Sequence, residues 1–131
     1  MNFCEICFLT VADVEEQHNA MLREFGGLAG IRDAGLLESA VMALQSGYNS
    51  TVSELASALA HGLALNHPFL DGNKRTALGA AAAFLGANGL APVFDASWFE
   101  TMVDVARGVV SRNELTARFA AAIGGDVTID G

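Results

Sequence analysis

The chain has 131 residues, of which 52% are hydrophobic and 17% charged, and a net charge of −8. So acidic a chain lacks the many cations that non-specific binding to DNA or RNA requires, and anionic membrane surfaces would repel it. No apolar run reaches the roughly 18 residues of a membrane span, and the first nine residues lack the basic start of a secretory signal. We therefore expect one globular, cytoplasmic domain that binds neither nucleic acid nor membrane directly.

The N-terminal region carries the pair Cys4 and Cys7 within a possible strand over residues 3–9. A zinc site would need a second C-x-x-C or an H-x3-H, and neither is present. A redox pair would normally begin a helix that follows a strand. We interpret both residues as reduced thiols at a chance spacing.

Helix start signals then recur, at which a side chain can accept a hydrogen bond from the backbone three residues later. They predict five helices, 11–25 from Thr10, 34–45 from Asp33, 52–66 from Thr51, 98–107 from Ser97 and 112–122 from Ser111.

A sixth helix is expected to begin near Asn73 and to end at Asn88-Gly89, where glycine takes the left-handed cap position. Its residues are apolar on nearly every face, which is typical of a buried central helix. Besides 3–9, the only strand candidate is 92–94. The sequence thus predicts an all-α bundle of about six helices over 1–123, with a short flexible tail at 124–131.

The segment 66-NHPFLDGNKRTAL-78 contains Lys74, the only lysine of the chain, beside Arg75. Two scarce cations in a first helical turn are placed against the helix dipole, which suggests that they meet an anion. The unpaired N–H groups of that turn also favour phosphate. Asp71 could hold Mg²⁺ shared with phosphate oxygens, and His67 is the nearby group that can accept a proton near neutral pH.

Other residues of this segment have structural tasks in the same interpretation. Pro68 disfavours helical geometry at His67, so the preceding helix ends there. Phe69 is the expected hydrophobic plug of the loop, and Gly72 lets the backbone turn and a ligand approach closely.

The run 67-HPFLDGNKR-75 resembles the signature of the Fic/Doc family, and agreement is closest with its death-on-curing (Doc) branch. The segments 8–18, 26–41 and 84–90 resemble Doc-type chains in order and spacing. The resemblance implies a small α-helical transferase that moves part of a nucleotide onto a protein hydroxyl. It implies His67 as general base, Asp71 as the Mg²⁺ ligand, and an anion hole made of Gly72, Asn73 and Arg75.

Two positions depart from the Fic branch, because Lys74 replaces its glycine and Leu78 its second arginine. We expect Lys74 and Arg75 to act on the phosphates during catalysis, and Leu78 to point into the core.

The Doc branch implies an ATP-dependent Ser/Thr kinase toxin that blocks translation, with elongation factor Tu as the suspected target. It also implies a Phd-like antitoxin whose C-terminal helix packs over the toxin. The alternatives are a Fic-type adenylyltransferase and a non-catalytic module that binds a nucleotide or an antitoxin.

Four further residues remain open at this point. Arg32 could face the target or the nucleotide, or could belong only to the turn before Asp33. His61 is interpreted as a core or supporting histidine, His18 as a packing or surface residue, and Trp98 as a core anchor.

Overall fold

The computed structural model describes residues 2–3, 6–45 and 49–129. Its described residues form six α-helices, so the predicted all-α class is confirmed. The helices are α1 (Val11–Phe25), α2 (Ala34–Met42), α3 (Val52–Asn66), α4 (Asn73–Ala87), α5 (Ser97–Ala106) and α6 (Arg112–Ala122). A 3-10 turn, η1 (Ala43–Gln45), completes the segment that was expected to be helical over 34–45.

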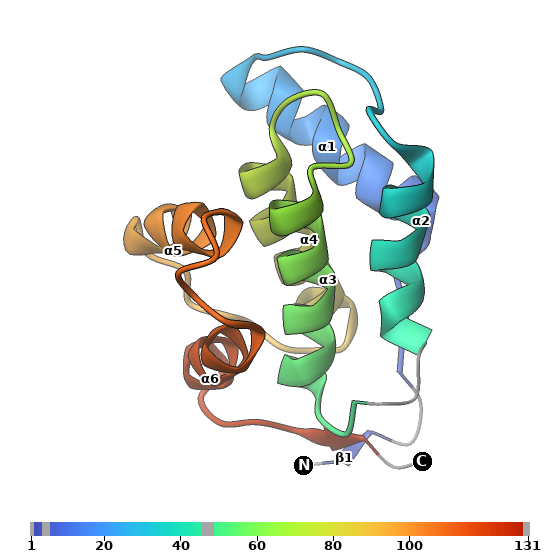
Figure 1. Ribbon diagram of the computed structural model, residues 1–131. Coiled ribbons are helices and arrows are strands. Elements are labelled where there is room, and N and C mark those ends of the chain that lie inside the picture. The colour runs from blue at the N-terminus through green and yellow to red at the C-terminus, as the bar shows by residue number, and fades with distance from the viewer. Residues whose placement is uncertain (1, 4–5, 46–48, 130–131) are drawn as a thin grey trace.

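Helices α3 and α4 run through the middle of the molecule, with α2 on one side and α5 and α6 on the other (Figure 1). Helix α4 packs against α1, α3 and α5, but Leu78 and Gly79 on it are only half-buried. Most residues of α3 are buried, from Val52 to Ala64. A buried central helix is therefore present, and α3 is the more deeply buried of the pair.

Most of the predicted helix starts are confirmed. The side chains of Thr10, Asp33, Thr51 and Ser111 each accept a backbone N–H three residues on. The start at Ser97 is wrong in detail, because Ser97 is itself helical and does not cap. Instead the Asp95 carboxylate accepts from the backbone and the hydroxyl of Ser97.

The β structure is minor and differs from the candidates. Strand β1 (Asn2–Phe3) pairs in parallel with β2 (Thr128–Ile129). Residues 92–94 form no strand, since Pro92 cannot donate to a ladder and only Val93 bonds outward, to the carbonyl of Ala122. Of the two cysteines, Cys4 lies outside the described residues and Cys7 is an exposed free thiol.

The described part of the expected flexible tail is bound to the body of the protein. Val127 is buried, and its carbonyl accepts from the Val52 N–H at 2.9 Å. The Asp126 carboxylate accepts from the Ser53 N–H at 3.1 Å, just beyond the cap of α3. Residues 126–129 therefore close the lower end of the helical core, a long-range contact that local composition does not reveal.

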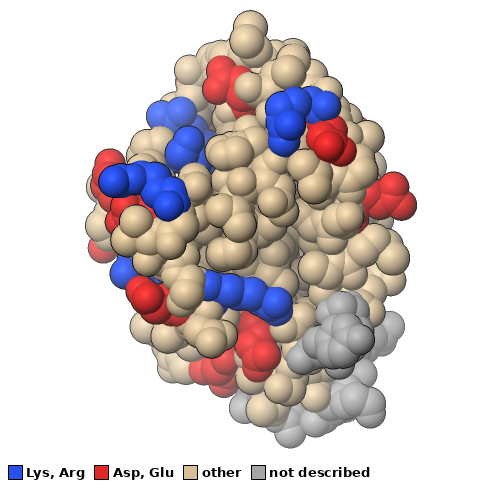
Figure 2. Space-filling model, in the orientation of Figure 1, with Lys and Arg blue, Asp and Glu red and all other residues tan. Residues whose placement is uncertain are grey.

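Figure 2 shows the charged side chains of one face as small separate groups on an otherwise uncharged surface. None of the described helices combines the length and the hydrophobicity needed to cross a bilayer.

Candidate active site

The motif loop, residues 67–72, joins α3 to α4 and lies beside the loop 26–33 that joins α1 to α2 (Figure 1). Backbone hydrogen bonds link the two loops. The Pro68 carbonyl accepts from the N–H groups of Arg32 and Asp33 at 2.7 and 3.0 Å, and the Leu70 N–H donates to Gly30 at 3.1 Å. The motif loop is therefore supported along its length by a segment about 40 residues earlier.

Phe69 anchors the loop, as predicted. It is buried, and its ring stacks on His18 at 3.9 Å with an interplanar angle of 7°. The buried His18 also donates from Nε2 to the Asp71 carbonyl oxygen at 2.8 Å. His18 does pack, as one of its two interpretations held, but its hydrogen bond to the motif loop was not foreseen.

The side chain of Asn73 also braces the loop, so it is not free to bind phosphate as predicted. Its amide oxygen accepts from the Phe69 N–H at 2.9 Å, and its amide nitrogen donates to the Phe69 carbonyl at 3.0 Å. The side chain is buried and both of its polar atoms are engaged. Only its backbone N–H is left for an anion.

The first turn of α4 presents cationic groups at the end of the motif loop. No described residue accepts from the backbone N–H groups of Asn73, Lys74 or Arg75, and no ion pair within the described ranges involves either cation. The guanidinium carbon of Arg75 lies 4.4 Å from the ring centroid of Phe25 and 4.8 Å from that of Phe99. These cation–π contacts hold the guanidinium without using its N–H donors.

Asp71 is exposed beside this turn. One carboxylate oxygen accepts from the Gly72 N–H at 2.9 Å and the other from the Leu28 N–H at 3.2 Å. Asp71, Gly72 and Arg75 line two adjoining hollows of about 170 and 90 Å³. No group of three or more potential metal-ligating side chains occurs in the described part of the chain.

His67 stands at the other end of the motif loop, half-buried. Its pKa is lowered, first by burial and then by the positive charges of Lys74 and Arg32. A histidine in this state is neutral near neutral pH and can accept a proton. Burial also lowers the pKa of His61, and the second cause is the positive charge of Arg112 at the start of α6.

A largely apolar cavity of about 420 Å³ lies beyond Arg75, between α1, α4 and α5. Leu78 packs against the core, as expected, but it is only half-buried and also lines this cavity. Arg75 is the one cation among the described residues that line the cavity.

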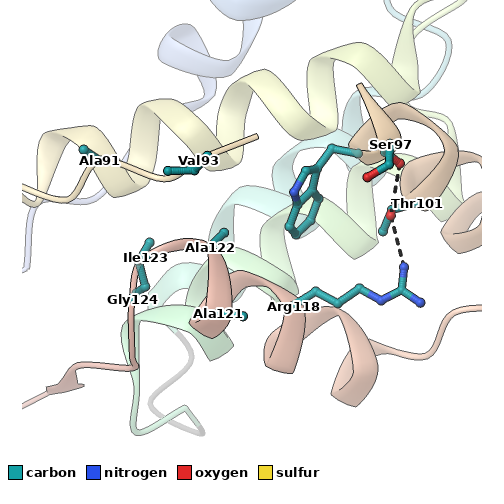
Figure 3. Close-up of a pocket in the computed structure, with 10 residues that line it drawn as sticks. Ala91, Val93, Ser97, Thr101, Arg118, Ala121, Ala122, Ile123 and Gly124 are labelled. Atoms are coloured by element: carbon teal, nitrogen blue, oxygen red, sulfur yellow. Dashed lines mark hydrogen bonds between the residues drawn. The ribbon is translucent and has the colours of Figure 1, made fainter. Parts of the chain in front are cut away.

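A second and larger cavity, of about 640 Å³, lies away from the motif, between α5 and α6 (Figure 3). Its polar groups are engaged with one another. Arg118 donates to the Thr101 hydroxyl at 3.0 Å, and that hydroxyl donates to the Ser97 carbonyl at 3.4 Å. Trp98 is buried at its wall and stacks on Phe119, as expected of a core anchor.

Comparison with known proteins identifies the family to which this motif belongs. Residues 8–85, more than half of the chain, match the family model described as Fic/DOC family. Toxin Doc of Mycolicibacterium smegmatis is 41% identical over 87 residues, which cover 61% of this chain and 67% of that protein. Protein kinase doc of Escherichia phage P1 is 37% identical over 82 residues, which cover 60% of this chain and 64% of that protein.

The matched part thus spans about two thirds of the length of these curated relatives. It includes α1 to α4 up to residue 85, and with them both loops of the candidate site. The chain belongs to the Fic/Doc family.

Proposed function

We propose that this chain is a toxin-type protein kinase that transfers the γ-phosphate of ATP to a Ser or Thr hydroxyl, with elongation factor Tu as the candidate target. One observation carries the proposal. The motif loop has His67, whose pKa is lowered, at one end. At its other end lie the N–H groups of residues 73–75, which have no acceptor, and the Arg75 guanidinium. The printed names of the two relatives, a toxin and a protein kinase, support it.

In the proposed reaction His67 accepts the proton of the attacking hydroxyl. The hydroxyl oxygen forms a bond to the γ-phosphorus, while the bond from that phosphorus to the bridging oxygen breaks and ADP leaves with the electron pair. The N–H groups of residues 73–75 and the Arg75 fork stabilise the negative charge of the transferring group. Phosphoryl transfer needs mainly such positioning and charge stabilisation.

Asp71 would hold Mg²⁺ in this scheme. A single exposed carboxylate beside a phosphate-sized hollow fits a cation that takes most of its ligands from phosphate and water. When bound, Mg²⁺ would neutralise charge on the nucleotide phosphates.

The choice of the γ- rather than the α-phosphate rests on Lys74 and Leu78. Leu78 places an apolar side chain where the Fic branch has an arginine for the nucleotide. Among the residues that line the cavity beside Leu78, Arg75 is the one cation. Further phosphates would find no partner there. The γ-phosphate is therefore expected to lie in the anion hole of residues 73–75, near His67.

Labelled ATP tests the reaction. The protein is incubated with purified elongation factor Tu, and separately with bacterial lysate, in the presence of ATP labelled at the α- or the γ-phosphate. We expect transfer of the γ-label, loss of transfer in His67→Ala with an unchanged melting temperature, and retention in His61→Gln. Transfer of the α-label would instead establish an adenylyltransferase, and nucleotide binding without transfer of either label a non-catalytic module.

An antitoxin of the Phd type is the proposed partner, and the surface beside the motif suits one. Large hydrophobic side chains are exposed there on the end of α1, both loops and α5. We call these the apolar rim, and they are Phe25, Leu28, Ile31, Leu70 and Phe99. An amphipathic helix could bury this rim and cover the site.

Growth assays test the partner. Wild-type protein expressed alone should arrest bacterial growth, whereas His67→Ala should not, and co-expression of the cognate antitoxin should restore growth. Leu28→Asp should weaken that rescue, because it places a charge in the rim, while Val93→Asp, at an equally exposed apolar residue away from it, should not. Equal rescue of all variants would place the antitoxin elsewhere.

A further inference from the structure

The backbone of His67 has an unusual conformation. With φ 50° and ψ 60°, it is the one non-glycine residue in the left-handed region within the described ranges. This conformation costs an L-residue about 1–2 kcal/mol. It persists only where the surrounding structure enforces it. Pro68 explains why α3 ends at this point, but not what holds His67 in the left-handed region.

Arg32 is the residue that contacts this helix end. Its Nε donates to the His67 carbonyl and its Nη2 to the Asn66 carbonyl, both at 2.6 Å. The last carbonyls of a helix have no partner within it, and a positive charge is favourable there. The Arg32 N–H also donates to Pro68 at 2.7 Å. Side chain and backbone of one arginine thus bind three consecutive carbonyls.

We propose that Arg32 is a positioning residue for the reaction, which holds His67 in its left-handed conformation by binding the carbonyls of Asn66 and His67 with one guanidinium fork. The inference rests on the proposed function only in assigning His67 as the base. Among the interpretations of Arg32 left open above it favours a structural one, because two of its guanidinium nitrogens are already bound to carbonyls.

Besides holding the backbone of His67, Arg32 favours the neutral, proton-accepting form of its ring. After burial and Lys74, it is the third cause that lowers the pKa of His67. A lysine at position 32 would keep this charge but would offer a single donor point instead of a planar fork. The two contributions of Arg32 can therefore be separated by substitution.

Nuclear magnetic resonance of the full chain tests the positioning without any assay of transfer. In Arg32→Gln we expect shifted amide signals for Asn66, His67 and Phe69, since Pro68 has no N–H, and a higher titration midpoint of the His67 ring. In Arg32→Lys the amide signals should shift while the midpoint stays near that of the wild type. Arg107→Gln, which removes an exposed arginine just after α5 that pairs with Asp104, is the charge-matched control and should change neither.

Transfer kinetics with γ-labelled ATP add the catalytic readout. Arg32→Lys should lower kcat at least tenfold and leave KM for ATP within about twofold, because the anion-binding groups of α4 are untouched. Unchanged amide signals at Asn66, His67 and Phe69 in a folded Arg32→Lys would refute the positioning role. Absence of transfer by the wild type, with the signals shifted as expected, would refute the kinase and leave the positioning of His67 standing.

Discussion

At the scale of single residues, the motif divides into side chains that hold the loop and side chains left for a ligand. Phe69 and Asn73 face inward. The Phe69 ring stacks on His18, and the Asn73 side chain bonds the backbone of Phe69. Arg75 is held differently, between two aromatic faces. Such cation–π contacts restrain the guanidinium without using its N–H groups, which remain for bidentate contact with a phosphate.

Phe99 should therefore matter for nucleotide binding although it belongs to α5. Phe99→Leu keeps an apolar side chain but removes the aromatic face, and exposed cation–π contacts contribute about 0.5–1 kcal/mol. We expect the Kd for ATP with Mg²⁺, measured by calorimetry, to rise about two- to fivefold. Phe99→Tyr should bind like the wild type, and so should Phe8→Leu, at an exposed phenylalanine outside the cavities that Arg75 lines. A wild-type Kd in Phe99→Leu would show that the stacking does not orient Arg75.

The protonation of His67 should set the acid limit of activity. Its pKa lies below the ordinary 6.5 because of burial, Lys74 and Arg32, so the neutral form required of a base persists to lower pH. We expect kcat at saturating ATP to fall with a midpoint below pH 6.5. Lys74→Met removes a positive charge and should move that midpoint upward, whatever it does to the rate. A wild-type midpoint above 6.5 would mean that another group controls the reaction.

At the scale of elements, the loop 26–33 serves as a wall for the motif loop. Its backbone bonds Pro68 and Leu70, and its Leu28 N–H bonds the Asp71 carboxylate. The fit is close at Gly27, where an added Cβ would lie 2.7 Å from Asp71 Oδ2. A glycine is needed here because a side chain would displace the carboxylate proposed to hold Mg²⁺.

Gly26 and Gly27 offer a matched pair to test this wall. Both have positive φ, 78° and 122°, but a Cβ at Gly26 would meet nothing within 4 Å. Alanine at either position should lower the free energy of unfolding by about 1–2 kcal/mol through backbone strain. Only Gly27→Ala should also weaken Mg²⁺-dependent ATP binding. Equal binding by the two variants would show that the position of Asp71 is not set by this contact.

The elements also show which features a sequence can predict. Helix starts that depend on a side chain three residues away were found from local spacing, as at Thr10 and Thr51. The sequence also places His67, Asp71 and Arg75 around one loop, because Pro68 ends α3 before His67 and α4 begins at Asn73. The contacts of His18 with Asp71 and of Arg32 with His67 join residues 53 and 35 positions apart. No local pattern encodes such pairs, because they exist only once α1 and the loop 26–33 have packed against the motif loop.

At the scale of the whole molecule, the first and the last described segments pair with each other far from the site. Strand β1 pairs with β2, and residues 126 and 127 bind the start of α3. Helix α3 then runs to the motif loop, with His67 directly after its last residue. The C-terminal segment thus stabilises one end of the helix whose other end presents the proposed base.

This link predicts that Val127 contributes to stability and not to chemistry. It is buried among the core side chains, so Val127→Ala should lower the free energy of unfolding by about 1–3 kcal/mol through lost burial and the cavity left behind. Val109→Ala, at an exposed valine after α5, should change it by less than about 0.5 kcal/mol. Urea denaturation measures both. Activity of Val127→Ala below its unfolding transition should match the wild type, because the site lies at the opposite end of α3. A loss of activity without a loss of stability would instead show that the C-terminal segment influences the motif loop through α3.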